Sequence, residues 1–183
     1  MKKILLFTFL LLCTLPVSSK KAGEFTVLQW NIWQEGTMVP GGYEAIVDEI
    51  IRLRPDFVTL SEVRNYNNTN FTARLTRSLK EKGETYYSFY TYDTGLLSRY
   101  PITDSLTVFP ENGDHGSIYR LTTDMNGKKM AVYTSHLDYL DDAYYNVRGY
   151  DGSTWEEIPI PTTVEEVLER NVASQRDDAI KMF

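Results

Sequence analysis

The sequence predicts an α+β fold in which layers of β-sheet are covered by helices. Two observations lead to this prediction. Up to residue 83, apolar runs typical of strands alternate with segments of helical spacing, and between residues 86 and 135 strand-like runs follow one another. Strands interleaved with helices and followed by a strand meander are typical of packed sheets with helices outside. The length of 183 residues, with 42% hydrophobic and 24% charged residues, is that of one globular domain.

Two strand–helix pairs make up the first half of the chain. Residues 25–30 form a continuous apolar run that we expect to be a strand buried on both faces, and residues 56–63 form the second strand. The helix after each strand is marked by apolar residues at helical spacing: Ile46, Ile50 and Leu53 in the first, and Phe71, Leu75 and Leu79 in the second. Pro55 ends the first helix and Gly83 ends the second.

The second half is predicted to consist mostly of strands. The runs with strand character are residues 86–92, 95–98, 106–109, 117–123 and 128–135. Asn126-Gly127 is a strong hairpin signal between the last two. Residues 139–161 then form a long irregular stretch rich in aromatic and acidic residues, which is either a binding rim or a packed surface loop.

A last helix is expected from residue 163 to the end of the chain. Thr163-Val-Glu-Glu166 forms a capping box, which is typical of a helix start. Apolar residues follow at helical spacing, and we expect them to form a buried stripe: Val164, Val167, Leu168, Val172 and Ala179.

Residues 1–19 are predicted to be a secretory signal peptide. Lys2-Lys3 form a basic start, an apolar stretch follows over residues 4–17, and Ser18-Ser19 are small residues suited to cleavage. The stretch is too short to span a bilayer, so no transmembrane anchor is expected. The single cysteine, Cys13, lies within it, so the mature chain is expected to have no disulfide partner. The expected localisation is secreted or periplasmic.

The charge of the chain bears on its partners. Cleavage after Ser19 would remove two of the 19 basic residues and none of the 25 acidic ones, which changes the net charge from −6 to −8. A molecule with this charge does not attract polyanions through its overall field. A nucleic-acid substrate would therefore need a local basic patch or a bound cation.

Polar side chains stand at the ends of three predicted strands: Asn31, Glu62 and His136. An amide, a carboxylate and an imidazole that converge at strand ends are suited to metal-assisted hydrolysis of a phosphoester. Each also has an ordinary explanation: a cap for Asn31, a solvent-exposed strand end for Glu62 and a structural role for His136. Asp138 lies two residues after His136, so in extended structure it shares the same face and either orients the imidazole or starts a turn.

Four short motifs occur in order along the chain. They are Leu28-Gln-Trp-Asn31, Leu60-Ser-Glu62, Gly95-Leu-Leu-Ser-Arg-Tyr-Pro101-Ile102 and Thr134-Ser-His-Leu-Asp138. In these motifs the chain resembles the endonuclease/exonuclease/phosphatase family, whose fold is similar to that of deoxyribonuclease I. The resemblance implies a four-layer α/β/β/α sandwich. It also implies a secreted, divalent-metal-dependent phosphoester hydrolase of the phosphodiesterase, phosphatase or nuclease class.

The resemblance further implies roles for the strand-end residues. The residue matching Glu62 binds a divalent cation, usually Mg²⁺ with Mn²⁺ as the alternative, and carboxylate oxygen suits either ion. The residue matching Asn31 supports the metal and the phosphate. The residue matching His136 acts on the scissile phosphate, a task favoured by a carboxylate partner that raises its pKa. We expect that partner to be Asp93, just before Gly95, and Asp138 is the other candidate catalytic carboxylate.

The family pattern also contains parts that are expected beyond residue 183, namely a Gly-Asp-x-Asn strand end and an Asp-His pair. Residues 20–183 are therefore interpreted as a truncated domain with an incomplete second sheet and impaired activity. The alternative is a family member without catalysis that acts at most as a binding module. His115 is expected to be a solvated loop residue, with a phosphate contact as the alternative.

The sequence does not identify one substrate. The resemblance allows DNA, RNA, sphingomyelin-type lipids and inositol phosphates. The net charge disfavours a general nuclease, and the loop that contains Tyr144, Tyr145, Tyr150 and Trp155 is suited to a sugar, a lipid headgroup or a base. A small phosphoester or a lipid headgroup is therefore the favoured substrate, with nucleic acid as the alternative.

Overall fold

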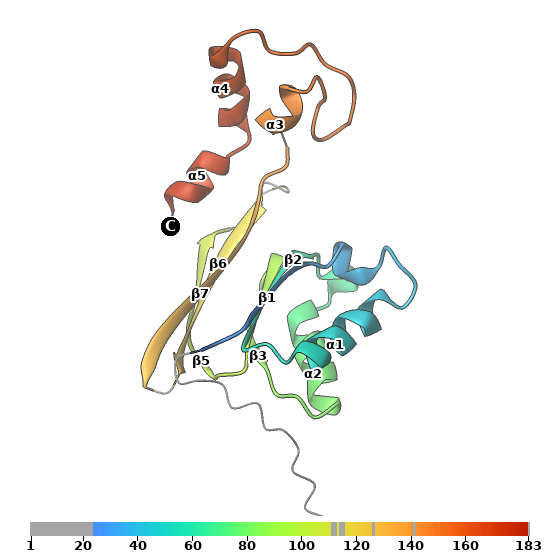
Figure 1. The fold of residues 1–183 in the computed structure, drawn as a ribbon, viewed down its shortest axis with the longest axis vertical. Coiled ribbons are helices and arrows are strands. Elements are labelled where there is room, and N and C mark those ends of the chain that lie inside the picture. The colour runs from blue at the N-terminus through green and yellow to red at the C-terminus, as the bar shows by residue number, and fades with distance from the viewer. Residues whose placement is uncertain (1–23, 111–112, 114–115, 126, 141, 183) are drawn as a thin grey trace, which may run out of the picture.

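Two β-sheets face each other in the centre of the computed structural model (Figure 1), which describes residues 24–110, 113, 116–125, 127–140 and 142–182. The strands of the first sheet are β1 (Val27–Asn31), β2 (Phe57–Val63), β3 (Tyr87–Ser88) and β4 (Asp93–Ser98), in the order β1-β2-β4-β3. The second sheet consists of β5 (Ile102–Phe109), β6 (Gly116–Met125) and β7 (Lys128–Leu137). The predicted signal peptide with Cys13 lies outside the described residues.

The pairing of the strands follows from the connections between them. β1 and β2 are parallel and are joined by a helix, whereas β4 runs antiparallel to both β2 and β3. β5, β6 and β7 form an antiparallel meander, and Met125 pairs with Lys128 across the hairpin that the Asn126-Gly127 signal predicted.

Helices α1 (Gly42–Leu53) and α2 (Phe71–Glu81) cover the outer face of the first sheet (Figure 1). Their apolar faces meet the sheet in one core, in which Ile50, Leu60 and Leu75 are almost completely buried. α1 ends one residue before Arg54, whose left-handed backbone precedes Pro55. α2 starts at the cap Asn70, whose side chain accepts a hydrogen bond from the Ala73 backbone.

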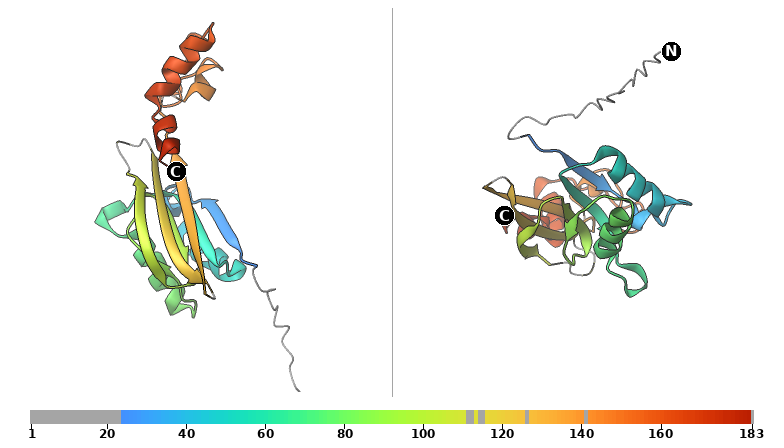
Figure 2. Two further views of the ribbon diagram at one scale, coloured as in Figure 1. Left: turned by 90° about the vertical axis from the view of Figure 1, so that its left-hand side faces the viewer. Right: turned by 90° about the horizontal axis from the view of Figure 1, so that it is seen from below.

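A second core fills the space between the two sheets. It contains Phe57 and Leu96 from the first sheet and Tyr119, Leu121 and Met125 from the second. The second sheet was expected to be incomplete. Its three strands nevertheless cover the inner face of the first sheet. The outer face of the second sheet is different: Leu106 and Tyr133 are exposed, and α5 (Arg176–Lys181) packs against this face only at one end, near Val108 and Ile118. Figure 2 shows this sheet with α5 beyond its upper end.

Two strand predictions need correction. The strand at residues 25–30 was expected to be buried on both faces, yet β1 is an edge strand on which every second residue is exposed, with Val27 at 48%. It pairs with β2 on one side, which leaves its other edge open. Of the run 86–92 only Tyr87–Ser88 pairs, because side chains satisfy the backbone that follows: Thr72 donates to the Phe89 carbonyl and Asn65 to the Thr91 carbonyl.

The last part of the chain forms a lobe beyond the ends of β6 and β7 (Figure 1). It contains α3 (Ala143–Asn146), α4 (Val164–Ala173) and α5 (Arg176–Lys181). The helix start predicted at Thr163 is confirmed, since the Thr163 hydroxyl accepts a hydrogen bond from the Glu166 backbone. The Glu166 carboxylate accepts its hydrogen bond from the backbone of Thr162, one residue before the cap, and not from that of Thr163 as in a regular capping box. No helix in the described part of the chain is long and apolar enough to cross a membrane.

The single C-terminal helix that the sequence predicted is in fact broken. Gln175 has a left-handed backbone (φ 56°) and separates α4 from α5. The predicted buried stripe is wrong for α4, because Val164, Leu168 and Val172 are 68, 56 and 70% exposed. Only Ala179 on α5 is buried, where it packs against Val108 and Ile118 of the second sheet. The break turns α5 towards the sheet and leaves the apolar side of α4 facing outward.

Candidate active site

The polar strand-end residues of the sequence meet at one end of the first sheet. Asn31 ends β1 and pairs in register with Ser61 of the parallel strand β2. Because β4 is antiparallel to β2, the start of β4 lies at the same end, where Asp93 pairs with Val63. The second sheet is joined to this point by a hydrogen bond between the hydroxyls of Thr94 and Ser117, and Ser117 is the β-sheet partner of His136.

Glu62 owes its position to a β-bulge. Ser61 pairs with Thr94 and Val63 with Asp93, so Glu62 is an extra residue on β2. Its φ of 68° lies in the left-handed region, which is uncommon for a residue with a long side chain. A bulge of this kind redirects a side chain that would otherwise follow the alternation of the strand. Here it directs the carboxylate towards the end of β1 and the loop that follows it.

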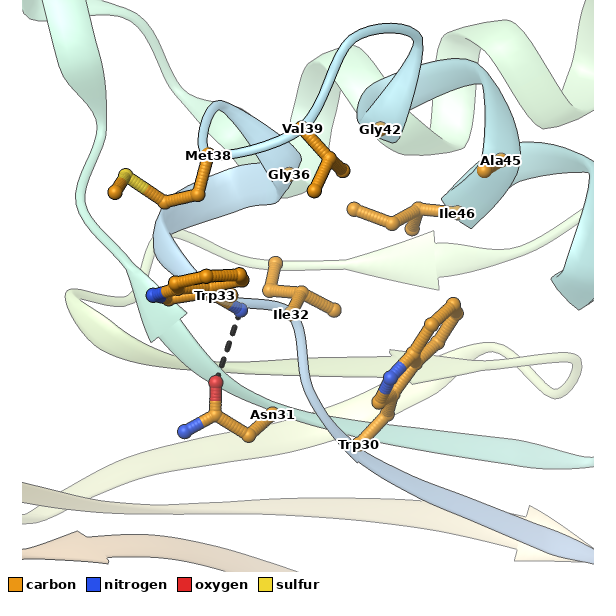
Figure 3. A pocket seen from close by; sticks show the side chains of 10 residues that line it. All are labelled: Trp30, Asn31, Ile32, Trp33, Gly36, Met38, Val39, Gly42, Ala45 and Ile46. Atoms are coloured by element: carbon orange, nitrogen blue, oxygen red, sulfur yellow. Dashed lines mark hydrogen bonds between the residues drawn. The ribbon is translucent and has the colours of Figure 1, made fainter.

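Hydrogen bonds hold both oxygens of the Glu62 carboxylate. Nδ2 of Asn31 donates to Oε1 at 2.7 Å, and the backbone N–H of Gln34 donates to Oε2 at 2.8 Å. The amide of Asn31 is held in turn, because its Oδ1 accepts a hydrogen bond from the backbone of Trp33 at 2.9 Å (Figure 3). The orientation of the amide is thus fixed, with the nitrogen towards Glu62 and the oxygen towards Trp33.

The loop after β1 is strained in the same way as the bulge. Trp33, Gln34 and Glu35 all have positive φ, at 42°, 54° and 61°. Such a run is costly for residues other than glycine and needs support from the surroundings. Glu35 supplies that support: its side chain is 2% exposed, and its Oε1 accepts hydrogen bonds from the backbones of Arg64 and Asn65 at 3.0 and 2.6 Å. This carboxylate ties the loop after β1 to the loop after β2.

Burial raises the pKa of Glu35 above its ordinary value, and the backbone hydrogen bonds from Asn65 and Arg64 oppose that shift. The sequence analysis did not identify Glu35 as important. No pattern in the sequence distinguishes it from a surface acid, because its partners are backbone groups almost thirty residues away.

His136 and Asp93 form the second half of the site. Nδ1 of His136 donates to the Asp93 carboxylate, with distances of 3.0 and 2.9 Å to its two oxygens. Asp93 is 2% exposed, and Nη1 of Arg64 lies 3.1 Å from its Oδ1. Arg64 was also missed from the sequence, although it lies two residues after Glu62 and so could have been placed at the same strand end.

The pKa of His136 is raised. The hydrogen bond to Asp93 is the largest cause, burial opposes it, and the negative charges of Asp93 and Glu62 add to the rise. The imidazole therefore stays protonated to a higher pH than a free histidine.

A glycine allows β6 to approach β7 at His136. Gly116 has a φ of 88°, and a Cβ built there would lie 2.2 Å from the carbonyl oxygen of His136. Any larger residue would have to move the strand that carries the imidazole.

Asp138 lies at the start of a turn. Its Oδ1 accepts a hydrogen bond from the backbone of Leu140, its side chain is completely buried, and its carbonyl accepts one from Nε of Arg176. Of the two carboxylates considered as partners of the imidazole, Asp93 is the one bonded to Nδ1. His115 lies outside the described residues.

The residues at this site were tested for their fit to a divalent cation. Within the described ranges no group of three or more His, Cys, Asp and Glu side chains is arranged to hold a metal. Within the described residues Glu62 has no ion pair with a cationic side chain, whereas Asp93 is paired with Arg64 and His136. The buried Glu35 is already held by two backbone N–H groups. A single fixed carboxylate with a neighbouring amide fits Mg²⁺, which is often bound through one or two carboxylates with water and substrate phosphate.

An apolar hollow adjoins Asn31 (Figure 3). It has a volume of about 250 Å³ and lies between the end of β1, the loop after it and the start of α1. Side chains that line it include Trp30, Trp33, Met38, Val39 and Ile46.

The fold and this geometry agree with a comparison of the sequence with family models. The model of the Endonuclease/Exonuclease/phosphatase family matches residues 28–178. The chain belongs to this family, and the two facing sheets with helices on the first are the deoxyribonuclease I-like α+β fold, here with its fourth layer incomplete among the described residues.

The chain is also similar to individual proteins. An uncharacterised protein of Caenorhabditis elegans, F14F9.5, is 28% identical over 128 residues, which cover 69% of this chain and 38% of that protein. Two solved structures are similar: a humanized D. rerio TDP2 with 14 mutations (TM-score 0.49, 18% identity, 68% of this chain and 52% of that one), and ANGEL2, described as a 2′,3′-cyclic phosphatase (TM-score 0.47, 17% identity, 65% and 43%). The chain thus spans about half or less of the length of these proteins.

Proposed function

We propose that this protein is a divalent-metal-dependent phosphoester hydrolase, with Mg²⁺ as the preferred ion. The observation that carries the proposal is the fixed Glu62 carboxylate at the same sheet end as the hydrogen-bonded His136–Asp93 pair, in a member of this family. The signal-like residues 1–19 support a secreted or periplasmic location.

The side chains have separate tasks in this proposal. Glu62 would hold the cation, and Asn31 with the Gln34 backbone would keep the carboxylate in place. The cation, when bound, would neutralise charge on the phosphate and so favour attack by water. His136 would stabilise negative charge on a phosphate oxygen or donate a proton to the leaving oxygen, and Asp93 would keep the imidazole charged and oriented.

The favoured substrate is a small phosphoester. The apolar hollow beside Asn31 supports a phosphoester that carries an apolar group, and the net charge of −6 does not support general binding of nucleic acid. A lipid headgroup is one member of this class.

The test is an assay of phosphodiester and phosphomonoester hydrolysis with the purified chain, in the presence of Mg²⁺, Mn²⁺ or a chelator. Glu62→Gln is expected to lower turnover by about a hundredfold or more, because it removes the charge that binds the cation. Glu44→Gln, on the exposed first turn of α1, is the matched control. If Glu62→Gln left metal-stimulated activity unchanged, Glu62 would not hold the metal.

The second candidate function is a non-catalytic family member that binds a ligand. One observation favours it: the described residues contain no group of three or more His, Cys, Asp and Glu side chains that could hold a metal. The same assay separates the two candidates, because a binding module would show no metal-dependent turnover of any phosphoester.

A further inference from the structure

The lobe beyond β7 contains an aromatic hollow that the proposed hydrolysis does not use. It has a volume of about 260 Å³ and is lined by Tyr145, Arg148, Tyr150 and Trp155. Three of its four walls are aromatic, and the fourth carries a guanidinium group. Trp155 is 62% exposed and Tyr150 42%, so both rings present a large part of their surface to the hollow and to solvent.

The loop that presents Trp155 is tightly built. Tyr150 and Glu157 pair as an isolated β-bridge, and the backbone of Asp151 donates to the carbonyl of Glu156. The Asp151 carboxylate accepts hydrogen bonds from the backbones of Ser153 and Thr154, both at 2.8 Å. The loop is therefore a closed turn with its own hydrogen bonds, rather than an open connection.

The conformation of Trp155 is itself unusual. Its φ is 63°, in the left-handed region, and its backbone N–H donates to the carbonyl of Asp151 at 2.9 Å. This geometry places a large exposed side chain where turns normally carry glycine or asparagine. Backbone strain of this kind is concentrated at sites that bind ligands.

The aromatic side chains hold one another in place. The rings of Tyr145 and Trp155 meet edge to face with centroids 4.9 Å apart, and Tyr144 meets Tyr145 in the same way at 5.4 Å. The loop can approach Tyr145 this closely because residue 152 is glycine: a Cβ there would lie 3.0 Å from the Tyr139 carbonyl and 3.2 Å from the Tyr145 ring. The indole is thus fixed along one side and exposed on the rest of its surface.

Arg148 is held at the rim of the hollow. Its Nη1 donates to the hydroxyl of Tyr144 at 3.0 Å, and its guanidinium lies 5.2 Å from the centre of that ring. The bond to Tyr144 uses one of the five N–H donors of a guanidinium. This group is suited to bidentate binding of a phosphate.

We infer that the hollow of Tyr145, Arg148, Tyr150 and Trp155 binds a nucleotide, with the base stacked on Trp155 and a phosphate on Arg148. Aromatic faces bind any base by stacking and need no specific hydrogen bonds, which suits walls that are mostly aromatic. A sugar ring would need more hydrogen-bonding groups than three aromatic rings and one arginine provide. The positive charge of Arg148 excludes cationic ligands such as a quaternary ammonium group and matches an anionic one.

The site proposed here is separate from Glu62 and His136, and its ligand need not be hydrolysed. The chain enters the lobe directly from β7, so α3 and the loop after it, which carry the residues that line the hollow, lie beyond the sheet end that carries His136 (Figure 1). A free mononucleotide and the end of a nucleic-acid single strand both present a base and a phosphate, so either could occupy this site. The experiment therefore includes both sources.

Binding is measured by isothermal titration and by quenching of tryptophan fluorescence on the purified chain, with a chelator present so that metal-dependent hydrolysis does not interfere. The ligands are adenosine and cytidine monophosphates, a four-nucleotide single-stranded oligonucleotide, adenosine without phosphate, and ribose 5-phosphate. Saturable binding of a mononucleotide assigns the site to a free nucleotide, and binding of the oligonucleotide alone assigns it to a strand end; both support the proposal. Binding of neither overturns it, and so does ribose 5-phosphate binding as tightly as the nucleotides.

The variants identify which hollow is responsible. Trp155→Gly keeps the positive φ and removes the ring, Arg148→Gln removes the charge, and each is expected to weaken binding about tenfold or more. Trp155→Tyr keeps an aromatic ring at this position, so it is expected to retain most of the affinity. The quenching of tryptophan fluorescence on binding should be lost in this variant. Arg77→Gln on the exposed face of α2 is the matched control and should bind as the original chain does, whereas Trp33→Tyr tests whether the ligand binds instead in the hollow beside Asn31. Weakening by Trp33→Tyr with no effect of Trp155→Gly would place binding in the other hollow and overturn the proposal.

Discussion

The imidazole of His136 on β7 is hydrogen-bonded to the carboxylate of Asp93 on β4, although the two residues are 43 positions apart and lie in different sheets. Their contact joins the sheets at the end where Glu62 and Asn31 also lie. Arg64 completes the arrangement by pairing with the same carboxylate. The buried Asp93 thus has two cationic or potentially cationic partners, and its hydrogen bond with His136 is the largest cause of the raised pKa of the imidazole.

The first prediction concerns the protonation of this pair. Asp93→Asn removes the charge of the hydrogen-bond acceptor and keeps its shape, so the pKa of His136 is expected to fall from its raised value. The measurement is an NMR titration of the imidazole protons, in which the second histidine of the chain, His115, serves as an internal reference. A His136 titration that did not move in Asp93→Asn would show that Asp93 does not control its pKa.

The raised pKa also predicts how stability depends on pH. Folded His136 binds its proton more tightly than the unfolded chain does, so its stabilising contribution is full below the ordinary pKa of 6.5 and is lost as the pH rises through the higher folded pKa. Urea unfolding at about pH 6 and about pH 9 checks this. The difference in free energy of unfolding between the original chain and His136→Gln should shrink at the higher pH, and a difference that grew would contradict the assignment.

Truncation of two glutamates at the site is predicted to change the free energy of unfolding by different amounts. Glu35→Ala leaves the buried backbone N–H groups of Arg64 and Asn65 without an acceptor and should lower the free energy of unfolding by about 2–4 kcal/mol. Glu62→Gly should change it by no more than about 1 kcal/mol, because relief of the positive φ offsets the loss of partly exposed hydrogen bonds.

Chemical denaturation of these variants, with the exposed Glu81→Ala as the control, measures both effects. A large loss for Glu35→Ala would show that Glu35 stabilises the loops around the site. A small change for Glu62→Gly would show that the backbone strain at Glu62 costs about as much as its hydrogen bonds contribute. If Glu62→Gly proved as destabilising as Glu35→Ala, the bulge would be a structural feature of the sheet and not a device that directs the carboxylate.

A pair of glycines tests the packing of β6 against β7. Gly127→Ala should cost about 1 kcal/mol, because φ is 81° and nothing lies within 4 Å of the added Cβ. Gly116→Ala has a similar φ of 88° but brings the Cβ to 2.2 Å from the His136 carbonyl, so it should be clearly more destabilising and should shift the His136 NMR signals. Equal losses of stability and an unchanged His136 spectrum would mean that the strands are not in close contact there.

The last prediction concerns the apolar side of α4. Leu168→Gln should change the free energy of unfolding by less than about 0.5 kcal/mol, because the side chain is 56% exposed. Leu121→Ala, in the core between the sheets, should cost about 2–5 kcal/mol and is the reference for a buried leucine. A large loss in Leu168→Gln would show that α4 is covered in solution.

Many of the secondary elements were predictable because their causes are local. The spacing of Ile46 and Ile50, the proline after α1, the capping box before α4 and the Asn126-Gly127 hairpin signal all act within a few residues. The exposure of these elements was less predictable. The apolar runs of β1 and α4 look buried in the sequence, but which faces are covered depends on the elements that pack against them.

The sequence by itself determined the family, the strand–helix order and the strand-end placement of Asn31, Glu62 and His136, because hydrophobic periodicity and short motifs record local structure. Only the tertiary structure decided how these residues are held. The bulge at Glu62, the buried Glu35 and the arginine on Asp93 depend on backbone and side-chain partners almost thirty residues away, which no local pattern encodes. The site is therefore a product of strand register and loop conformation, while its chemical groups were already visible in the chain.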